Sequence, residues 1–474
     1  MTKPRPFLNS RIWIAFGLMS ILFSLISLPV LGLIAYNWFD EDLLPQTQDA
    51  LKWKAPDDAF IENGYFILWG WDAPDGIDAY EHGKNIVLEH IYLHAQKSPK
   101  KNWEAIKSKQ EFSNDKKDTD WRCDYKKADC VAQYLSDRSL RQLSIDKRAN
   151  SIARYGLLKN LSKFEEIIPP SPHVPFPNWI NIQTAMEAER IKAVYAINDG
   201  QTEFGLALLR SNSQLSRRMM TGSSSLIARK IALQAIHRDA RIVSELIRSY
   251  PKIAIEQADT LAPILNSISS KSFSLEKAFA FEGAMAINLL ESDVLLADPS
   301  KLPVLARLKE SLSLIFLSLQ RNASLNIIGL WPRLVGKAAE SPANELDAIT
   351  SKIKQEYQDA LGWNIAGLFY PKNPIGKILA NTAKGDGWLR FIERQHDVEG
   401  YLRLVSLQLL IAKNKISEAA VPPFLASAPQ TLRNPYNLNP MIWDSKSKRI
   451  IFEARQESKS NPEQDRNFSV PVGL

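Results

Sequence analysis

The longest apolar stretch of the chain lies near its start. No charged residue occurs between Arg11 and Asp40, and the segment from Ile12 to Phe39 is broken only by serines, two glycines, Pro29 and one asparagine. A membrane-crossing helix needs about 20 apolar residues, whereas a cleavable secretion signal has an apolar core of only about 7 to 15. The segment therefore predicts an uncleaved transmembrane anchor over residues 12–39, with a cleaved signal as the alternative.

The charges on either side of this segment predict its orientation. Lys3, Arg5 and Arg11 precede it without any acidic residue, and the acidic stretch "DEDLLPQTQD" follows it. Because basic flanks stay in the cytoplasm, we expect residues 1–11 to form a cytoplasmic tail and the bulk of the chain to be exported. A bacterial inner-membrane protein with a periplasmic bulk fits this pattern.

Apolar residues recur at helical spacing along most of the remaining chain. After the turn sequence "DAPDGID", the rhythm predicts a helix over Ala79–Ala95, and residues 129–168 also have a helical pattern. The segment "PPSPHVPFPNW" then interrupts any helix, because proline lacks the amide hydrogen that a helix needs. We expect a membrane-proximal helical subdomain over residues 40–168 and a proline-rich linker or surface strap over 169–179.

Residues 180–430 predict an array of helices joined by short turns. "IQTAMEAERIKAVYAINDG" ends on Asp-Gly, a natural helix stop, and "TGSSSL" supplies capping residues before the next apolar run. Further helical patterns cover residues 256–267, 274–290, 305–319 and 343–360, and another follows "HDVEGYLRL". The fold class expected is mainly α, built from packed antiparallel hairpins in a tetratricopeptide-like or irregular array.

The carboxyl end has a different pattern. Residues 431–454 predict a small β-hairpin, with strands near 441–443 and over Arg449–Glu453 on either side of a polar turn. The last residues, 455–474, are polar, and we expect a loose tail.

Composition adds constraints on compartment and partners. Three of the 59 basic residues lie in the inner tail, which leaves 56 against 52 acidic residues, a nearly neutral exported part with interleaved signs. We therefore expect no nucleic-acid partner, because such a partner requires a concentrated basic face. The only two cysteines, Cys123 and Cys130, stand close together, which in an oxidising compartment predicts a local disulfide.

Several stretches resemble a group of uncharacterised proteobacterial inner-membrane proteins that have a large helical periplasmic part. They are "YFILWGWDAPDGIDAYEHG", "SLIARKIALQAIHRDARIVSEL", "NPIGKILA", "HDVEGYLRLVSLQLL" and "NPYNLNPMIWD". The resemblance implies this topology and fold class and carries no activity with it. "NPYNLNPMIW" is also similar to short Asp-Pro-Tyr/Phe hairpins of exported proteins, with Asn434 in place of the usual acid.

Two groups of residues are candidates for chemistry. His90 and His94 are four residues apart on the predicted helix, and His82 lies near the same face, an arrangement that can hold zinc or copper. Surface histidines on an amphipathic helix are the commoner explanation. Glu282 stands among apolar residues, where burial would raise its pKa for acid–base work; a helix cap or an arginine pair is the structural alternative.

The remaining patterns favour structure over chemistry. Asp72, Asp75 and Asp78 have a spacing that can bind calcium, but the other ligands of a calcium loop are missing, which favours a plain turn. No P-loop, G-x-G-x-x-G or G-x-S-x-G pattern is present, so we expect no cofactor and no serine nucleophile. The sequence favours a non-enzymatic interaction or scaffold module for another envelope protein; the alternative is an envelope hydrolase, metal-dependent through the histidines.

Overall fold

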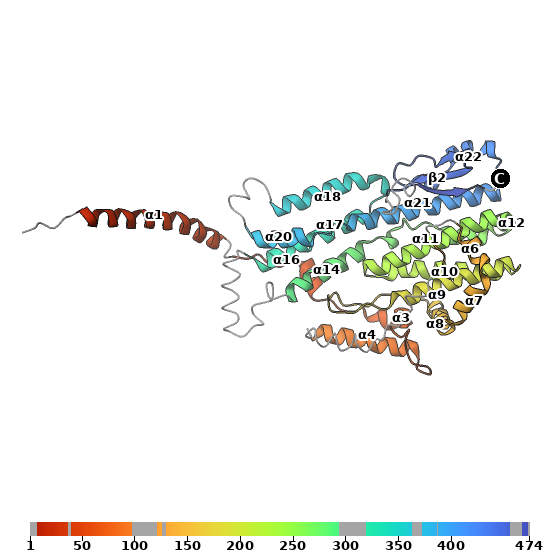
Figure 1. Ribbon diagram of the computed structural model, residues 1–474, viewed down its shortest axis with the longest axis horizontal. Coiled ribbons are helices and arrows are strands. Elements are labelled where there is room, and N and C mark those ends of the chain that lie inside the picture. Colours follow the sequence, from red (N-terminus) through yellow and green to blue (C-terminus); the bar gives the residue numbers. More distant parts are fainter. Residues whose placement is uncertain are drawn as a thin grey trace, which may run out of the picture. The chain divides into compact units, whose positions relative to one another are not determined.

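The computed structural model describes residues 7–36, 39–96, 121–125, 129–292, 319–362, 372–385, 387–455 and 467–472. In these ranges the chain is mainly helical, with a small antiparallel sheet near the carboxyl end (Figure 1). It divides into a smaller unit of residues 1–52, 286–331 and 354–385, and a larger unit of residues 53–285, 332–353 and 386–474. The proline-rich segment 169–179, where the sequence suggested a boundary, lies within the larger unit.

The smaller unit contains the first helix, α1 (Phe7–Tyr36), which covers most of the predicted anchor (Figure 1). Its large apolar side chains include Phe16, Phe23 and Leu25, which are 63%, 73% and 66% exposed. Within the described part of the chain, no helix combines the length and the apolar character needed to cross a membrane.

The acidic residues that follow α1 bind a later helix of the same unit. Both carboxylate oxygens of Asp40 accept hydrogen bonds from the first turn of α16 (Arg321–Ile328), from Asn322 N at 2.6 Å and Ala323 N at 3.0 Å. A carboxylate at a helix start is favourable because the amides there lack partners within the helix. Among the described residues of this unit, the other helices that lie wholly in it are α2 (Pro45–Leu51) and α20 (Pro374–Ala383).

The larger unit holds most of the helices. Its described residues include the complete α-helices α3 (Tyr65–Trp69), α4 (Ala79–Ala95), α6 (Cys130–Ser136), α7 (Arg138–Asp146), α8 (Ala149–Asn160), α9 (Trp179–Asn198), α10 (Thr202–Gly222), α11 (Leu226–Ser249), α12 (Pro251–Glu256), α13 (Ala258–Leu261), α21 (Trp388–Lys413) and α22 (Val421–Ser427). Short 3₁₀ turns are η1 (Asp57–Phe60), η2 (Ala262–Leu265), η3 (Lys271–Phe273), η5 (Ala343–Glu345), η6 (Glu418–Ala420) and η7 (Gln430–Leu432). Three more helices, α14 (Glu276–Ser292), α17 (Leu330–Ala339) and α18 (Leu346–Leu361), have residues in both units.

The core of the larger unit is formed by the long helices α9, α10, α11 and α21, which lie side by side (Figure 1). The turns between α9, α10 and α11 are short, covering residues 199–201 and 223–225. Gly200 ends α9 in the left-handed region at φ +84°, where glycine has no steric penalty, so the Asp-Gly stop is confirmed. The predicted hairpins are therefore present, although the structure does not identify a tetratricopeptide repeat.

Charged side chains lie at the centre of this helical core. Arg190 of α9 is 1% exposed and donates to Asp239 of α11 at 2.7 Å, and the same carboxylate oxygen accepts from Asn212 of α10 at 2.7 Å. Arg190 also donates to Glu187, one turn earlier on α9, at 3.3 Å. Buried charges must be paired, because each loses its hydration on folding.

The small sheet has three strands, in the order β1 (Ile442–Asp444), β2 (Arg449–Glu453), β3 (Asn467–Pro471), all antiparallel. The predicted hairpin is confirmed, but the expectation of a loose tail over 455–474 is wrong at β3. Val470 of β3 is fully buried, and Gln408 of α21 donates to the Pro471 carbonyl oxygen at 2.7 Å. These contacts with distant residues hold a short strand in which polar and apolar residues alternate.

One predicted helix is interrupted in the structure, and most of another lies outside the described residues. Residues 256–267 do not form one helix, because the chain turns through α13 and η2, and Pro263 occupies the start of η2. Proline cannot donate the hydrogen bond that would continue the preceding helix. Of the predicted helix over 305–319, residues 305–318 lie outside the described residues.

Helix α4 begins at Ala79 and ends at Ala95, as predicted, and a glycine allows it to contact α3 closely. A methyl group on Gly83 would lie 1.8 Å from the Phe66 carbonyl oxygen, whereas one on Gly156, within α8, would meet nothing within 4 Å. Gly83 therefore has no room for a side chain, whereas Gly156 does.

We expect Gly83→Ala to lower the free energy of unfolding by about 2 kcal/mol or more, because the backbone of α3 would have to move. Gly156→Ala is the control: it removes the same helix-propensity penalty without a clash, so it should raise stability by up to about 1 kcal/mol. Urea denaturation of the two variants measures both effects, and equal shifts would contradict the close approach of α3 and α4.

Candidate functional site

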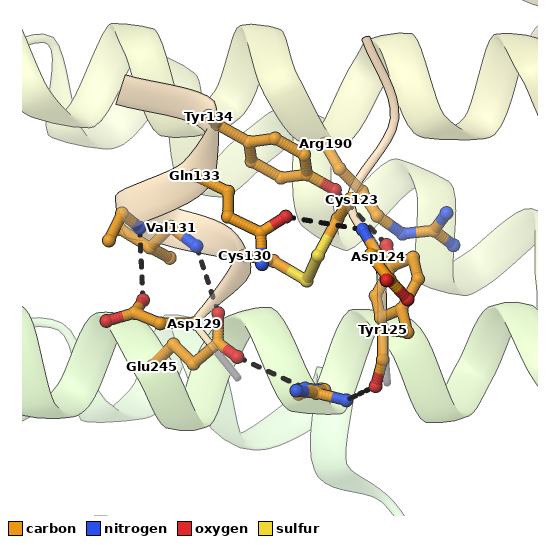
Figure 2. The surroundings of a disulfide bond; sticks show 12 residues. Cys123, Asp124, Tyr125, Asp129, Cys130, Val131, Gln133, Tyr134, Arg190 and Glu245 are labelled. Carbon is orange, nitrogen blue, oxygen red and sulfur yellow. Dashed lines mark hydrogen bonds and ion pairs between the residues drawn. A yellow bond between two sulfur atoms is a disulfide. The ribbon is translucent and has the colours of Figure 1, made fainter. Parts of the chain in front are cut away.

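The predicted disulfide is present, and it joins two buried cysteines of the larger unit. The Cα atoms of Cys123 and Cys130 are 5.4 Å apart, and the two residues are 7% and 0% exposed, respectively. Cys130 opens α6, whose cap is Asp129; its carboxylate accepts from Ala132 N at 3.0 Å. Figure 2 shows the bridge lying beside Arg190 of α9.

Residues in and just after the loop that this bridge closes supply hydrogen-bond donors to a buried carboxylate. Glu187 accepts hydrogen bonds from Cys123 N at 3.0 Å, from the Tyr134 hydroxyl at 2.7 Å and from the Tyr125 hydroxyl at 2.9 Å. Burial acts to raise the pKa of Glu187, but Arg190 and the bonds from Cys123 and Tyr134 outweigh it and lower the pKa. The carboxylate thus stays ionised inside the core.

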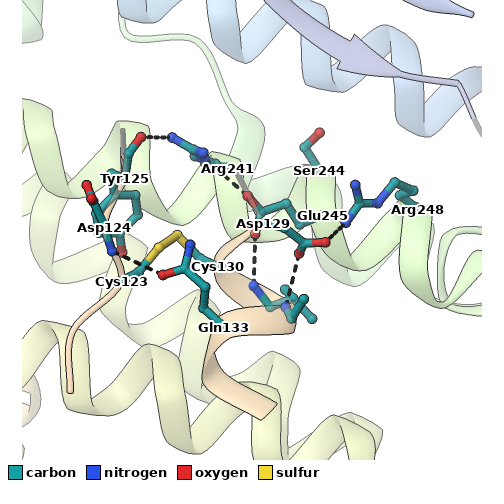
Figure 3. A network of polar contacts seen from close by, with 12 residues as sticks. Cys123, Asp124, Tyr125, Asp129, Cys130, Gln133, Arg241, Ser244, Glu245 and Arg248 are labelled. Atoms are coloured by element: carbon teal, nitrogen blue, oxygen red, sulfur yellow. Dashed lines mark hydrogen bonds and ion pairs between the residues drawn. A yellow bond between two sulfur atoms is a disulfide. The ribbon is translucent and has the colours of Figure 1, made fainter. Parts of the chain in front are cut away.

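The opposite side of the same segment is bound by α11 (Figure 3). Glu245 accepts from Val131 N at 3.0 Å and from Arg241 Nε at 3.1 Å. Arg241 also donates to the Tyr125 carbonyl oxygen, and Arg248 pairs with Asp129. With α9 on one side and α11 on the other, the disulfide holds its segment against the core, which is a structural role.

A separate feature of the larger unit has the character of a binding site. A cavity of about 670 Å³ is lined by the turn 269–274, the turn 339–344, residues of α21 between 395 and 403, and the loop 430–438. This volume falls within the range of about 300–1,000 Å³ typical of ligand sites. We call it the polar cleft, since hydroxyl, amide and charged side chains make up most of its lining.

The floor of the polar cleft is formed by buried polar residues of α21. Glu399 is 1% exposed and accepts from Ile268 N at 2.8 Å, from the Ser267 hydroxyl at 2.9 Å and from Arg403 Nε at 2.8 Å. His396 is 8% exposed, and its Nε2 has no hydrogen-bond partner in the part of the chain that the structure describes. Burial lowers the pKa of His396 to about 4, so the ring is neutral at pH 7.

One wall of the polar cleft is the "NPYNLNP" loop, which contributes Pro435 and Leu438 to the lining. The Asn434 side-chain oxygen accepts from Tyr436 N at 2.9 Å, and its backbone closes the loop onto Asn439 and Leu438. Such an Asx turn needs a side-chain oxygen, which an asparagine and an aspartate both supply. The Tyr436 hydroxyl then donates to Asp397 of α21 at 2.7 Å, which fixes the wall to the floor.

The three candidate histidines have separate surroundings in the structure. His90 is 2% exposed and packs edge-on against Trp69, with ring centroids 4.6 Å apart, and burial lowers its pKa to about 4. His94 packs against Trp53 with centroids 5.7 Å apart, while His82 is partly exposed. Across the described ranges, no three His, Cys, Asp or Glu side chains are grouped as a metal would require.

Glu282 is a residue of α14 whose side chain reaches the start of α11. Its carboxylate accepts from Leu226 N, the first residue of α11, at 3.0 Å, and Glu166 accepts from Ser224 N and Ser225 N, both at 2.7 Å. Burial raises the pKa of Glu282, and the negative charge of Glu166 adds to the effect. The structural alternative, a cap, describes this geometry; Arg229 donates instead to the Ser223 carbonyl oxygen at 2.8 Å.

The aspartates of "WDAPDGID" serve a turn. Asp78 caps α4 by accepting from Tyr80 N at 2.8 Å and Glu81 N at 2.9 Å. Asp72 accepts from the Asn181 side chain at 3.4 Å, and burial raises its pKa. Asp75 is exposed.

Sequence reasoning missed the polar cleft and the buried charges of α9. The signal for Glu187 and Arg190 was a pair of opposite charges three residues apart within a helix that is otherwise buried. His396 and Glu399 stand in the polar stretch "ERQHDVEG" of α21, where no sequence signal marked them as buried. No family model, curated protein or solved structure matches this chain.

The disulfide's contribution to stability can be measured. Replacing both cysteines (Cys123→Ala/Cys130→Ala) frees the loop, and we expect the free energy of unfolding to fall by about 2–4 kcal/mol. Urea denaturation with and without reductant provides the control, since reductant should weaken the wild-type chain and leave the double variant unchanged. A wild-type chain as stable under reductant as without it would contradict the structural role.

Proposed function

We propose that this chain is a single-pass protein of a bacterial inner membrane whose exported helical part acts as an interaction or scaffold module for another envelope protein. In this proposal residues 12–39 form the anchor, the amino terminus is cytoplasmic, and the partner binds at the polar cleft. The topology is also that of the inner-membrane proteins that the sequence resembles.

The anchor rests on the sequence of residues 12–39. These residues carry no charge, basic residues precede them and acidic residues follow them. Several side chains of the segment, including those of residues 12–14, 29–30 and 33–34, lie outside the described set. The exposed apolar side chains of α1 support a lipid environment, because such surface is costly in water.

An exported location is supported by the cysteine pair. Disulfides persist in the periplasm and on cell surfaces and are rare in the cytosol. Cys123 and Cys130 are placed to form one, and their segment is built into the core through Glu187 and Glu245. A reducing compartment would leave this part of the core without its covalent link.

The observation that carries the interaction function is the polar cleft, whose buried charged side chains are already hydrogen-bonded within the protein. Glu399 has three hydrogen-bond donors, and Arg403 donates to it and, at 3.0 Å, to the Arg433 carbonyl oxygen. A general acid or base needs a group that is free to exchange a proton with a substrate, and Glu399 and Arg403 are not free. His396 keeps an unused nitrogen, but no carboxylate is hydrogen-bonded to its ring among the described residues to orient or activate it, so the arrangement favours recognition of a ligand over chemistry on it.

The topology can be tested with reporters fused after Leu474. We expect a reporter that is active only after export to be active, and one that is active only in the cytosol to be inactive. Leu22→Arg/Leu25→Arg should reduce export, because an arginine at the centre of a membrane helix costs about 2.5–3.5 kcal/mol, whereas Leu22→Ile/Leu25→Ile should not. Activity of only the cytosolic reporter would overturn the proposed location.

The interaction function can be tested by photo-crosslinking in intact cells. A photoreactive amino acid at Thr431, an exposed position on the rim of the polar cleft, should give a light-dependent adduct with another protein. The same amino acid at Gln214, an exposed position on α10, is the control and should give none. Equal adducts at both positions, or none at Thr431, would contradict the proposal.

A further inference from the structure

The polar cleft also limits the chemistry of what it binds. Building on the proposed function, we infer that its ligand is an uncharged, extended peptide segment of the partner protein. Three properties of the lining support this inference: its charge balance, the hydrogen-bonding groups on its rim, and its small apolar surfaces.

The charged side chains of the polar cleft cancel in pairs. Arg403 binds Glu399 on the floor at 2.8 Å, with side chains that are 15% and 2% exposed. Lys271 binds Glu340 at the mouth at 3.1 Å, with side chains that are 84% and 32% exposed. An anionic or cationic ligand would meet no net field and would have to compete with an existing pair. A neutral ligand leaves both pairs intact.

The rim presents groups that both donate and accept hydrogen bonds. Asn344, Gln430 and Thr431 are exposed, and their side chains have no hydrogen bond within the described part of the chain. An extended peptide offers alternating N–H and C=O groups, which amide and hydroxyl side chains can match in either direction. Below the rim, the neutral ring of His396 adds a nitrogen whose hydrogen-bonding capacity is unused.

The apolar part of the lining comes from small aliphatic side chains. They belong to Ala339, Pro342, Ala343, Pro435 and Leu438, and no Phe, Tyr or Trp is among the cavity-lining residues of the described chain. Saccharide rings bind by stacking their C–H faces on aromatic side chains, a surface that is absent from this lining. Small side chains of a peptide can pack against prolines and alanine, so a peptide fits better than a glycan.

The test uses the full-length protein in lipid nanodiscs and a phage-displayed library of random peptides. We expect enriched peptides with few Asp, Glu, Lys or Arg residues. Synthetic copies should bind Asn344→Ala/Gln430→Ala about tenfold or more weakly, because two hydrogen bonds are lost. Gln201→Ala/Gln214→Ala removes two exposed amides elsewhere on the same unit and should bind like the wild type. Affinity should change less than about twofold between low and high salt.

Each other result overturns the inference. Enrichment of charged peptides whose affinity falls steeply with salt would show an ionic site, and equal binding to Asn344→Ala/Gln430→Ala would place the peptides outside the polar cleft. Binding of soluble saccharides in a glycan array, with no peptide enriched, would make the ligand a glycan. If the Thr431 adduct forms while no peptide binds, the interaction function stands and the peptide inference alone fails.

Discussion

The burial of three charged side chains among α9, α10 and α11 is the constraint on which the larger unit depends. Removing an ion from water costs several kcal/mol, so Glu187, Arg190 and Asp239 are tolerable inside only when they meet in one geometry. Arg190 pairs with both carboxylates, and Asn212 brings α10 into the same contact. An apolar interface tolerates sliding of helices, whereas this one fixes their register, because a shift would leave a buried charge unpaired.

This constraint also explains why the cysteine segment lies where it does. Arg190 alone does not complete the hydrogen bonds of Glu187; the Cys123 amide and two tyrosine hydroxyls do so. If this segment moved away, a buried carboxylate would lose most of its donors, which costs more than loss of an ordinary surface contact. The disulfide restrains a segment that the core needs, so its role is to maintain that core.

Local patterns in the sequence predicted the elements that local interactions determine. The limits of α4 followed from the turn sequence "DAPDGID" and the apolar rhythm after it, and the end of α9 followed from the Asp-Gly stop at Gly200. The cysteine pair was also predictable, since only two cysteines exist and they are close in sequence. Strand β3 was not, because its stability comes from pairing with β2 and from Gln408, contacts between residues far apart in the chain.

The polar cleft escaped prediction for a related reason. Its lining comes from four separate segments, and each is ordinary alone: a serine-rich turn, a helix end, four polar residues of α21 and an asparagine-containing loop. Only the fold brings them together, and α21 does so with Glu399 and Asp397, which bind two of the walls. Both walls are therefore fixed before a ligand arrives, and little further ordering is needed for binding. Buried charged residues of α21 hold the walls of the polar cleft in place, but the charges of its lining cancel in pairs. The cleft is therefore suited to an uncharged segment of a partner.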